Sequence, residues 1–227
     1  MKTPELLVKS FLGLLFLLSV MGATLFVPYG SFNYHLAWLY LAVFGIPVVV
    51  ITVYLFLFDK HLLETRIAVG PVSETRPIEK IIQSIAGIAF LGIFVVSAFD
   101  YKNNWTQVPV ALSYVSNLFC LLAFVWLFFV FKQNTYLSAT IEVQEKQHVV
   151  STGLYGIVRH PMYTGAMILL LFTPIALGSY YGLLPVIVLV VVISYRAIDE
   201  EKELKQNLVG YKEYCEKVRF RLIPFVF

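Results

Sequence analysis

The stretch that decides the fold covers residues 159–201 and reads RHPMYTGAMILLLFTPIALGSYYGLLPVIVLVVVISYRAIDEE. It holds two apolar runs, 162–177 and 181–195, which meet at the short segment GSYYG, residues 178–182. Apolar runs of this kind are typical of helices within a bilayer. Because the connection is so short, we expect a tight helical hairpin that brings the charged ends of the stretch together.

The rest of the chain has the composition of a membrane protein. Of its residues 59% are hydrophobic and 14% are charged, whereas soluble domains carry about 25% charged residues. Four longer apolar runs precede the hairpin, at 11–29, 35–58, 81–99 and 108–131. We therefore expect an all-α integral membrane protein with about six transmembrane helices. The first run follows Lys2 and Lys9 as in a signal peptide, but no small-residue cleavage site follows it, so we interpret it as a retained helix.

Lysine and arginine placement predicts the orientation. Six spans would put the segments 59–80, 132–161 and the tail after residue 195 on one side, and that side would hold all 17 Lys and Arg residues except Lys102. Cytoplasmic loops carry such an excess, so we expect a multi-pass protein with cytoplasmic N- and C-termini. The net charge of +3 is scattered. It suits contact with membrane lipids and gives no sign of nucleic-acid binding.

Polarity divides the chain into two regions. Residues 1–131 form a predicted four-helix transmembrane region, and residues 132–227 hold the hairpin, the polar clusters and a charged tail. The charges of the 59–80 loop are interpreted as a solvated face. The last long helix should continue to residue 207, with a break at Gly210. Tyr211, Tyr214 and Val218 then share one face of a short amphipathic helix, which either lies on the membrane or folds back as a lid.

The polar clusters each have a structural and a functional interpretation. Residues 134–150 are too polar for a span, and an ordinary inner loop would account for them. Arg159 can be a boundary arginine that reaches for water, and Pro161 can start a helix after an extended His160. Alternatively, free N–H groups at this helix start could join Arg159 or His160 in binding an anionic or polar ligand.

The cluster RAIDEE, residues 196–201, lies at the other end of the hairpin. Arg196 and Glu200 are four residues apart, which suits a simple salt bridge along one helix face. The hairpin, however, should place them beside His160, and ionisable groups at membrane depth are candidates for function. No Cys or His spacing suggests a metal site, and Cys120 and Cys215 lie too far apart along the predicted topology to form a disulfide.

Five short motifs occur in an order that resembles the isoprenylcysteine carboxyl methyltransferase family. After Gln144 come STGLY, RHPMY, RAIDEE, YKEY and LIP. The resemblance covers roughly residues 131–227 and includes the hairpin. It implies methylation of a lipophilic substrate at the cytoplasmic face, with S-adenosyl-L-methionine as cofactor.

The resemblance also implies roles for individual residues. Arg196 would contact the substrate and, with Glu200, form the catalytic pair. The cofactor would be bound by Gln144, Gln147, His148, Val149, Val150, Tyr155, His160, Pro161, Met162, Tyr163 and Glu200. The substrate would be a prenylcysteine-like acid that enters from the bilayer.

Three other functions remain open at this stage. A phospholipid N-methyltransferase would use the same methyl donor on an amine. A membrane reductase of the sterol-reductase type would bind NADPH, but the motifs show no cluster of Arg or Lys for its 2′-phosphate. A small transporter or scaffold would need polar groups at mid-membrane depth, and the early spans offer only Thr, Ser, Asn and Gln there.

Overall fold

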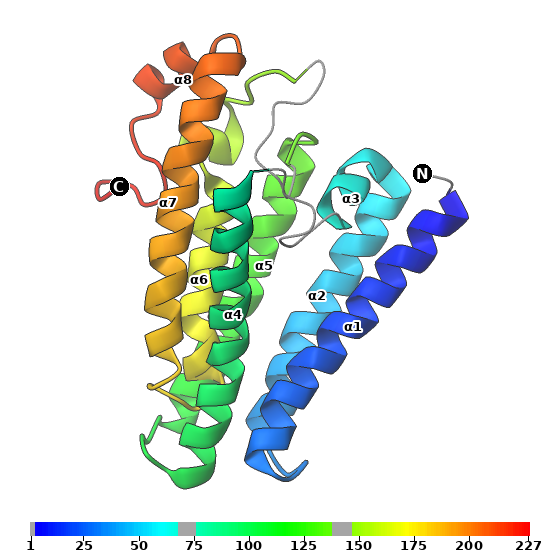
Figure 1. Ribbon diagram of the computed structural model, residues 1–227, viewed down its shortest axis with the longest axis vertical. Helices are drawn as coiled ribbons and strands as arrows, with labels where there is room; N and C mark the ends of the chain where they lie inside the picture. Colours follow the sequence, from blue (N-terminus) through cyan, green and yellow to red (C-terminus); the bar gives the residue numbers. More distant parts are fainter. Residues whose placement is uncertain (1–2, 68–75, 138–146) are drawn as a thin grey trace.

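The computed structural model describes residues 3–67, 76–137 and 147–227, and these residues fold as a bundle of helices (Figure 1). The described part contains no strand. The elements are α1 Thr3–Tyr29, α2 His35–Phe58, α3 Lys60–Ile67, α4 Pro77–Asn103, α5 Val110–Gln133, the 3-10 turn η1 Gly153–Gly156, α6 Pro161–Ala176, α7 Leu183–Asn207 and α8 Tyr211–Lys217. The predicted all-α membrane architecture is confirmed.

The six predicted spans correspond to six helices of unequal character. Four of them, α1, α2, α4 and α5, are long and apolar enough to cross a membrane. The helix α6 is apolar but has only 16 residues. The helix α7 has 25 residues, and its charged residues begin at Arg196. The hairpin is therefore built from one short helix and one helix whose second half is charged.

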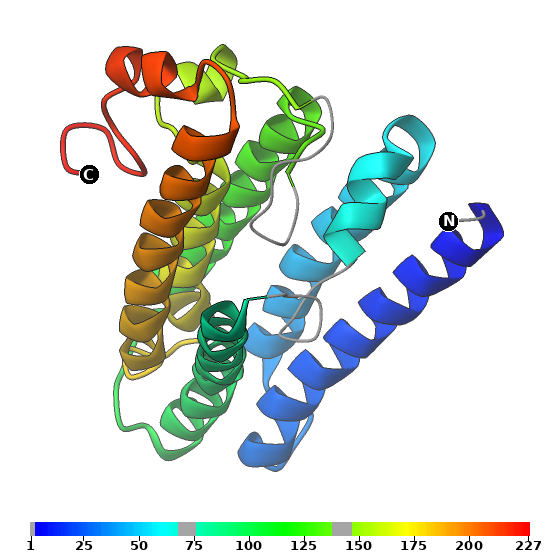
Figure 2. The same ribbon diagram turned by 45° about the horizontal axis from the view of Figure 1, so that its top comes forward.

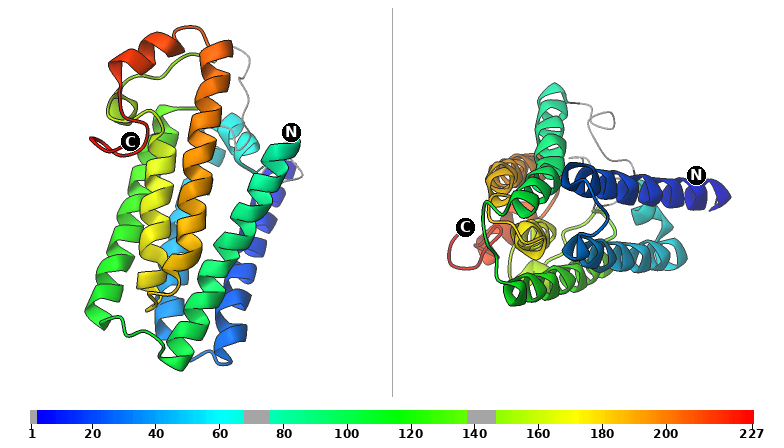
Figure 3. Two further views of the ribbon diagram at one scale, coloured as in Figure 1. Left: turned by 60° about the vertical axis from the view of Figure 1, so that its left-hand side comes forward. Right: turned by 90° about the horizontal axis from the view of Figure 1, so that it is seen from below.

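The helices pack in pairs that join early and late parts of the chain. The hairpin helix α6 lies along α5, while α7 lies along α4 (Figures 1 and 3). Tyr40 of α2 shares a 2.8 Å hydrogen bond with Thr173 of α6, so the first half of the bundle also contacts the hairpin. Both chain ends lie toward the end of the bundle that carries α3 and α8 (Figure 2). That this end faces the cytoplasm stays a prediction.

A buried aspartate fixes the turn of the hairpin. Asp100 of α4 is fully buried and accepts a 2.5 Å hydrogen bond from the Ser179 hydroxyl and a 2.7 Å bond from the Thr106 N–H. Gly178 precedes Ser179 with φ of +80°, a conformation that disfavours other residues. The tight hairpin predicted from GSYYG is thus present, and α4 holds it in place.

Local sequence signals set the helix ends at the opposite side of the bundle. Pro161 occupies the first turn of α6 after His160, which has φ of −123°. The helix α7 ends at Asn207, and Gly210, with φ of +83°, leads into α8. Tyr211 and Tyr214 of α8 are buried together with Val218 against the end of α7. The tail therefore folds back against α7, and the alternative of a helix that lies on the membrane stays a prediction.

We predict that Gly182→Ala destabilises the hairpin. A Cβ at residue 182 would overlap the Ser97 hydroxyl and the Pro174 ring, so α4, α6 and α7 would have to separate. Overpacking of this kind costs about 1–3 kcal/mol, which should appear as a lower melting temperature in detergent. The control is Gly87→Ala, where a Cβ meets nothing within 4 Å. Equal melting temperatures for the two variants would contradict the close packing at the turn.

Candidate functional site

A pocket lies at the end of the bundle that α8 covers. The space between the residues that line it is about 840 Å³, part of which is open to solvent. The described residues with a predicted role all line it: Gln147, His148, Val149, Val150, Tyr155, His160, Pro161, Met162, Tyr163, Arg196 and Glu200. Gln144 lies outside the described residues. The structure thus brings the predicted residues together, while their roles stay predictions.

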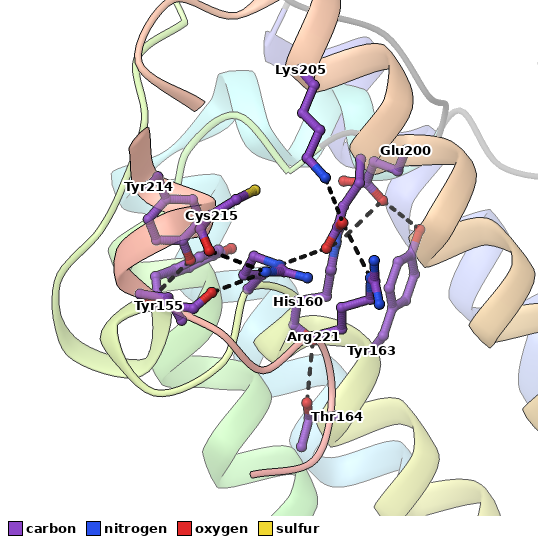
Figure 4. Close-up of polar contacts among 12 residues, drawn as sticks. Tyr155, His160, Tyr163, Thr164, Glu200, Lys205, Tyr214, Cys215 and Arg221 are labelled. Carbon is purple, nitrogen blue, oxygen red and sulfur yellow. Dashed lines mark hydrogen bonds and ion pairs between the residues drawn. The ribbon is translucent and has the colours of Figure 1, made fainter. Parts of the chain in front are cut away.

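The hairpin forms one wall of the pocket. The Tyr163 hydroxyl of α6 donates a 2.8 Å hydrogen bond to Glu200 Oε2 of α7 (Figure 4). The His160 ring stacks on Tyr163 with ring centres 5.6 Å apart, and its Nδ1 lies 3.9 Å from the same carboxylate oxygen. The predicted convergence of RHPMY with RAIDEE is therefore observed. Glu200 presents a carboxylate to the pocket that is oriented by a neutral hydroxyl.

Tyr155 forms a second wall. The amide of Asn134 donates a 3.0 Å hydrogen bond to its hydroxyl, and the hydroxyl of Tyr214 donates a 2.7 Å bond to its carbonyl. Burial raises the pKa of Tyr155 well above its usual range, so it stays a neutral phenol. The end of α5, η1 and α8 are joined through this one residue. Because Gln147 and His148 also line the pocket, the described end of the 134–150 segment is more than an ordinary inner loop.

Arg159 is buried in an ion-pair network instead of reaching for water. Its Nε lies 2.6 Å from Glu201 Oε1, and its Nη1 donates a 3.0 Å hydrogen bond to the Val218 carbonyl. Glu201 also meets Arg221 at 3.1 Å and His160 Nε2 at 3.4 Å. Although burial raises the pKa of Glu201, the nearby His160 ring and the positive charges of Arg159 and Arg221 lower it to about 2.

The tail binds the backbone N–H groups of the two residues that precede α6. The backbone N–H of Arg159 donates to the Phe220 carbonyl and that of His160 to the Arg221 carbonyl, both at 2.9 Å. Thr164 adds a 2.6 Å bond from its hydroxyl to the Leu222 carbonyl (Figure 4). These two N–H groups are therefore not available for a ligand. The side chain of His160, by contrast, still lines the pocket.

Arg196 has a partner that sequence spacing did not suggest. Its Nη1 lies 3.3 Å from Glu79 Oε2 of α4, and both side chains are buried. The salt bridge to Glu200 is not among the ion pairs of the described residues, since Glu200 is bonded to Tyr163. The interpretation of the 59–80 segment as a solvated face is wrong for Glu79, which is fully buried. A glutamate in the first turn of a span was the signal that could have identified it.

Tyr211 lines the pocket, although no ligand role is predicted for it from the sequence. Its side chain is 4% exposed, and its hydroxyl has no hydrogen-bond partner within the part of the chain that the structure describes. Burial raises its pKa far above the usual range, helped by the charges of Glu200 and Glu201, so the hydroxyl stays protonated. A buried hydroxyl without a partner costs about 1–3 kcal/mol. A ligand in the pocket would offset that cost.

Comparison with known proteins gives partial matches. Residues 110–210 match the family described as phospholipid methyltransferase. This range covers α5, η1, α6 and α7 and contains every residue that lines the pocket except Tyr211 and Tyr214. A segment of 92 residues, 39% of the chain, is 33% identical to the Delta(14)-sterol reductase of Mus musculus and spans 22% of that protein. The chain therefore matches less than a quarter of the length of this curated relative.

The pKa of Glu201 predicts how stability depends on pH. Because this pKa falls from an ordinary 4.5 to about 2 on folding, the ionised carboxylate stabilises the fold above pH 4.5, and this contribution is lost as the pH falls toward 2. Glu201→Gln should lower the free energy of unfolding by about 3 kcal/mol at neutral pH. It should also reduce the fall in melting temperature between pH 4.5 and pH 2, which is the acid limb of a plot of melting temperature against pH. Glu216→Gln, at an exposed site in α8, is the control. An unchanged acid limb in Glu201→Gln would rule out this network as its origin.

The two tyrosines of α8 should respond oppositely to loss of the hydroxyl. Tyr211→Phe removes an unpaired hydroxyl, so the ligand-free protein should be as stable as the parent or more stable by up to about 1 kcal/mol. Tyr214→Phe removes the donor of the 2.7 Å bond to the Tyr155 carbonyl and should cost about 1 kcal/mol. Thermal unfolding of both variants without ligand measures the difference. A clear loss of stability in Tyr211→Phe would mean that its hydroxyl is already bonded.

Proposed function

We propose that this protein is a membrane methyltransferase that uses S-adenosyl-L-methionine and carboxyl-methylates a lipophilic acid of the prenylcysteine type. One observation carries the proposal. The range that matches the phospholipid methyltransferase family coincides with the helices whose His160, Tyr163 and Glu200 meet in the pocket. The excess of Lys and Arg at this end of the bundle supports a cytoplasmic location for the reaction.

The residues that line the pocket suit the chemistry of the proposed cofactor. S-adenosyl-L-methionine combines an aromatic base, hydroxyl groups, a sulfonium cation and a charged amino-acid end. Glu200 offers a carboxylate for a cation or hydroxyl, and Tyr155 and Tyr163 offer aromatic surface to a cation. The unpaired Tyr211 hydroxyl can donate a hydrogen bond. Residues 147–150 and 160–163 would hold the cofactor from the other sides.

The residues of the chain contribute positioning and exclusion of water. When bound, S-adenosyl-L-methionine supplies an electrophilic methyl group, so that an oxygen–carbon bond forms while the sulfur–carbon bond breaks and S-adenosylhomocysteine leaves. A carboxylate acceptor is already ionised at neutral pH, so no residue has to remove a proton. Arg196 would orient this carboxylate through its guanidinium. The folded-back α8 covers the pocket, and opposite charges attract more strongly where water is excluded.

Ligand binding tests the proposal directly. The purified full chain in detergent would be titrated with S-adenosyl-L-methionine, S-adenosylhomocysteine and NADPH, with the melting temperature as readout. We expect saturable stabilisation by the first two compounds. Tyr211→Phe and Glu200→Gln should each weaken S-adenosylhomocysteine binding by about tenfold, while Glu213→Gln, an exposed site in the same tail, should not. Binding of NADPH alone would overturn the proposal.

A reductase is the second candidate, because of the partial identity with the Delta(14)-sterol reductase. NADPH carries a 2′-phosphate, which needs clustered cations. The described pocket lining contains Arg159 and Arg196, and these are paired with Glu201 and Glu79 respectively. The methyltransferase proposal is therefore preferred. A phospholipid acceptor, which the matched family's description names, would be recognised by mass spectrometry of the methylated product.

A further inference from the structure

The guanidinium of Arg66, in α3, lies at the pocket end of the bundle, in addition to that of Arg196. The helix follows α2 directly, and the Asp59 carboxylate caps it by accepting a 3.0 Å hydrogen bond from the Leu62 N–H. The Nη1 of Arg66 lies 3.4 Å from the sulfur of Met162, which lines the pocket. Its guanidinium lies 5.3 Å from the centre of the Phe131 ring. The side chain thus packs between the ends of α5 and α6.

No carboxylate among the described residues pairs with the charge of Arg66. Among residues 3–67, 76–137 and 147–227, its contacts are Met162 and Phe131, and none is a carboxylate. Burial lowers the pKa of Arg66, and the positive charge of Arg196 acts in the same direction. A thioether is a weak acceptor, and a cation–π contact contributes about 0.5–2 kcal/mol. Neither group replaces the hydrogen bonds that a guanidinium makes in water.

Arg196 differs from Arg66 in this respect, although the two lie close enough for their charges to interact. Glu79 already neutralises Arg196 at 3.3 Å. Arg66 therefore adds a positive charge near Tyr163 that pairs with no carboxylate among the described residues. This position is next to the methyl-transfer pocket and next to the boundary of the α2 span. An amphiphilic molecule in the bilayer would present its head group at that depth.

We propose that Arg66 binds an anionic oxygen group, a carboxylate or a phosphate, in the head of the lipophilic methyl acceptor. The inference rests on the proposed function and adds the charge of the acceptor and the residue that selects it. A guanidinium presents paired N–H donors that match either anion. Phe131 and Met162 hold the Arg66 guanidinium in place. Its remaining N–H donors are therefore free to bind an anion without loss of side-chain entropy.

A simpler explanation treats Arg66 as a boundary cation that attracts any membrane surface. Lys60 of the same helix fits that description, since it is exposed and lies over the Phe56 ring. The pair Arg66→Gln and Lys60→Gln therefore removes the same charge from the same helix at two depths. Arg66→Lys keeps the charge but loses the paired donors, and it serves as a second variant if Arg66→Gln does not fold.

The experiment measures binding of defined amphiphiles to the full chain in a neutral detergent. The probes are palmitate, dioctanoyl phosphatidic acid and the uncharged palmitamide, and S-adenosylhomocysteine and NADP⁺ are titrated in parallel. We expect one or both anionic probes to bind more tightly than palmitamide. Arg66→Gln should weaken that binding by about tenfold or more, as for loss of a charged hydrogen-bond pair. Lys60→Gln should leave it unchanged, and S-adenosylhomocysteine affinity should be the same in all variants.

Each outcome decides a separate point. Loss of palmitate binding alone supports a carboxylate acceptor, and loss of phosphatidic acid binding alone supports a phosphate-bearing lipid. Equal effects of Arg66→Gln and Lys60→Gln would overturn the inference in favour of a general surface charge. Loss of NADP⁺ binding in Arg66→Gln would overturn it in favour of a cofactor phosphate. Failure of the parent protein to bind S-adenosylhomocysteine, with anionic probes still bound, would instead refute the proposed function.

Discussion

The buried carboxylate of Glu201 is the interaction on which the pocket end of the molecule depends. It pairs with Arg159 at the start of α6 and with Arg221 in the tail, while His160 lies within 3.4 Å. Three segments that are distant in sequence therefore share one charge. Removing Glu201 would leave the buried Arg159 without its carboxylate partner, which is strongly destabilising. The hairpin and the folded-back tail are for this reason one structural unit.

That unit explains the composition of the pocket. With Glu201 committed to the network, its neighbour Glu200 is left on the pocket side, where Tyr163 orients it. The tail carries Tyr211 over the pocket with a hydroxyl that has no partner in the described chain. Two adjacent carboxylates thus take different roles, because one helix turns successive side chains about 100° apart. Glu201 stabilises the fold, and Glu200 is available to a ligand.

Much of the local structure could be predicted from the sequence. The run lengths indicated the helices, Pro161 marked the start of α6, and Gly210 marked the break before α8. The order of the motifs also identified residues that meet in one pocket. Which charged side chains pair with each other could not be predicted in the same way. Arg196 contacts Glu79, more than a hundred positions away, instead of Glu200 on its own helix, and Arg159 is buried although its position at a membrane boundary suggested exposure.

The sequence by itself determined the class of the fold and the positions of its helices, because apolar run length, proline and glycine act on the backbone within a few residues. It also indicated, through a tight hairpin, that RHPMY and RAIDEE would converge. Only the tertiary structure decided which charges pair and which polar groups remain for a ligand. Those outcomes depend on which helices lie side by side: α4 brings Glu79 to Arg196, and α3 brings Arg66 to Met162. A charged side chain several ångströms long can reach many partners, so spacing along one helix does not select among them.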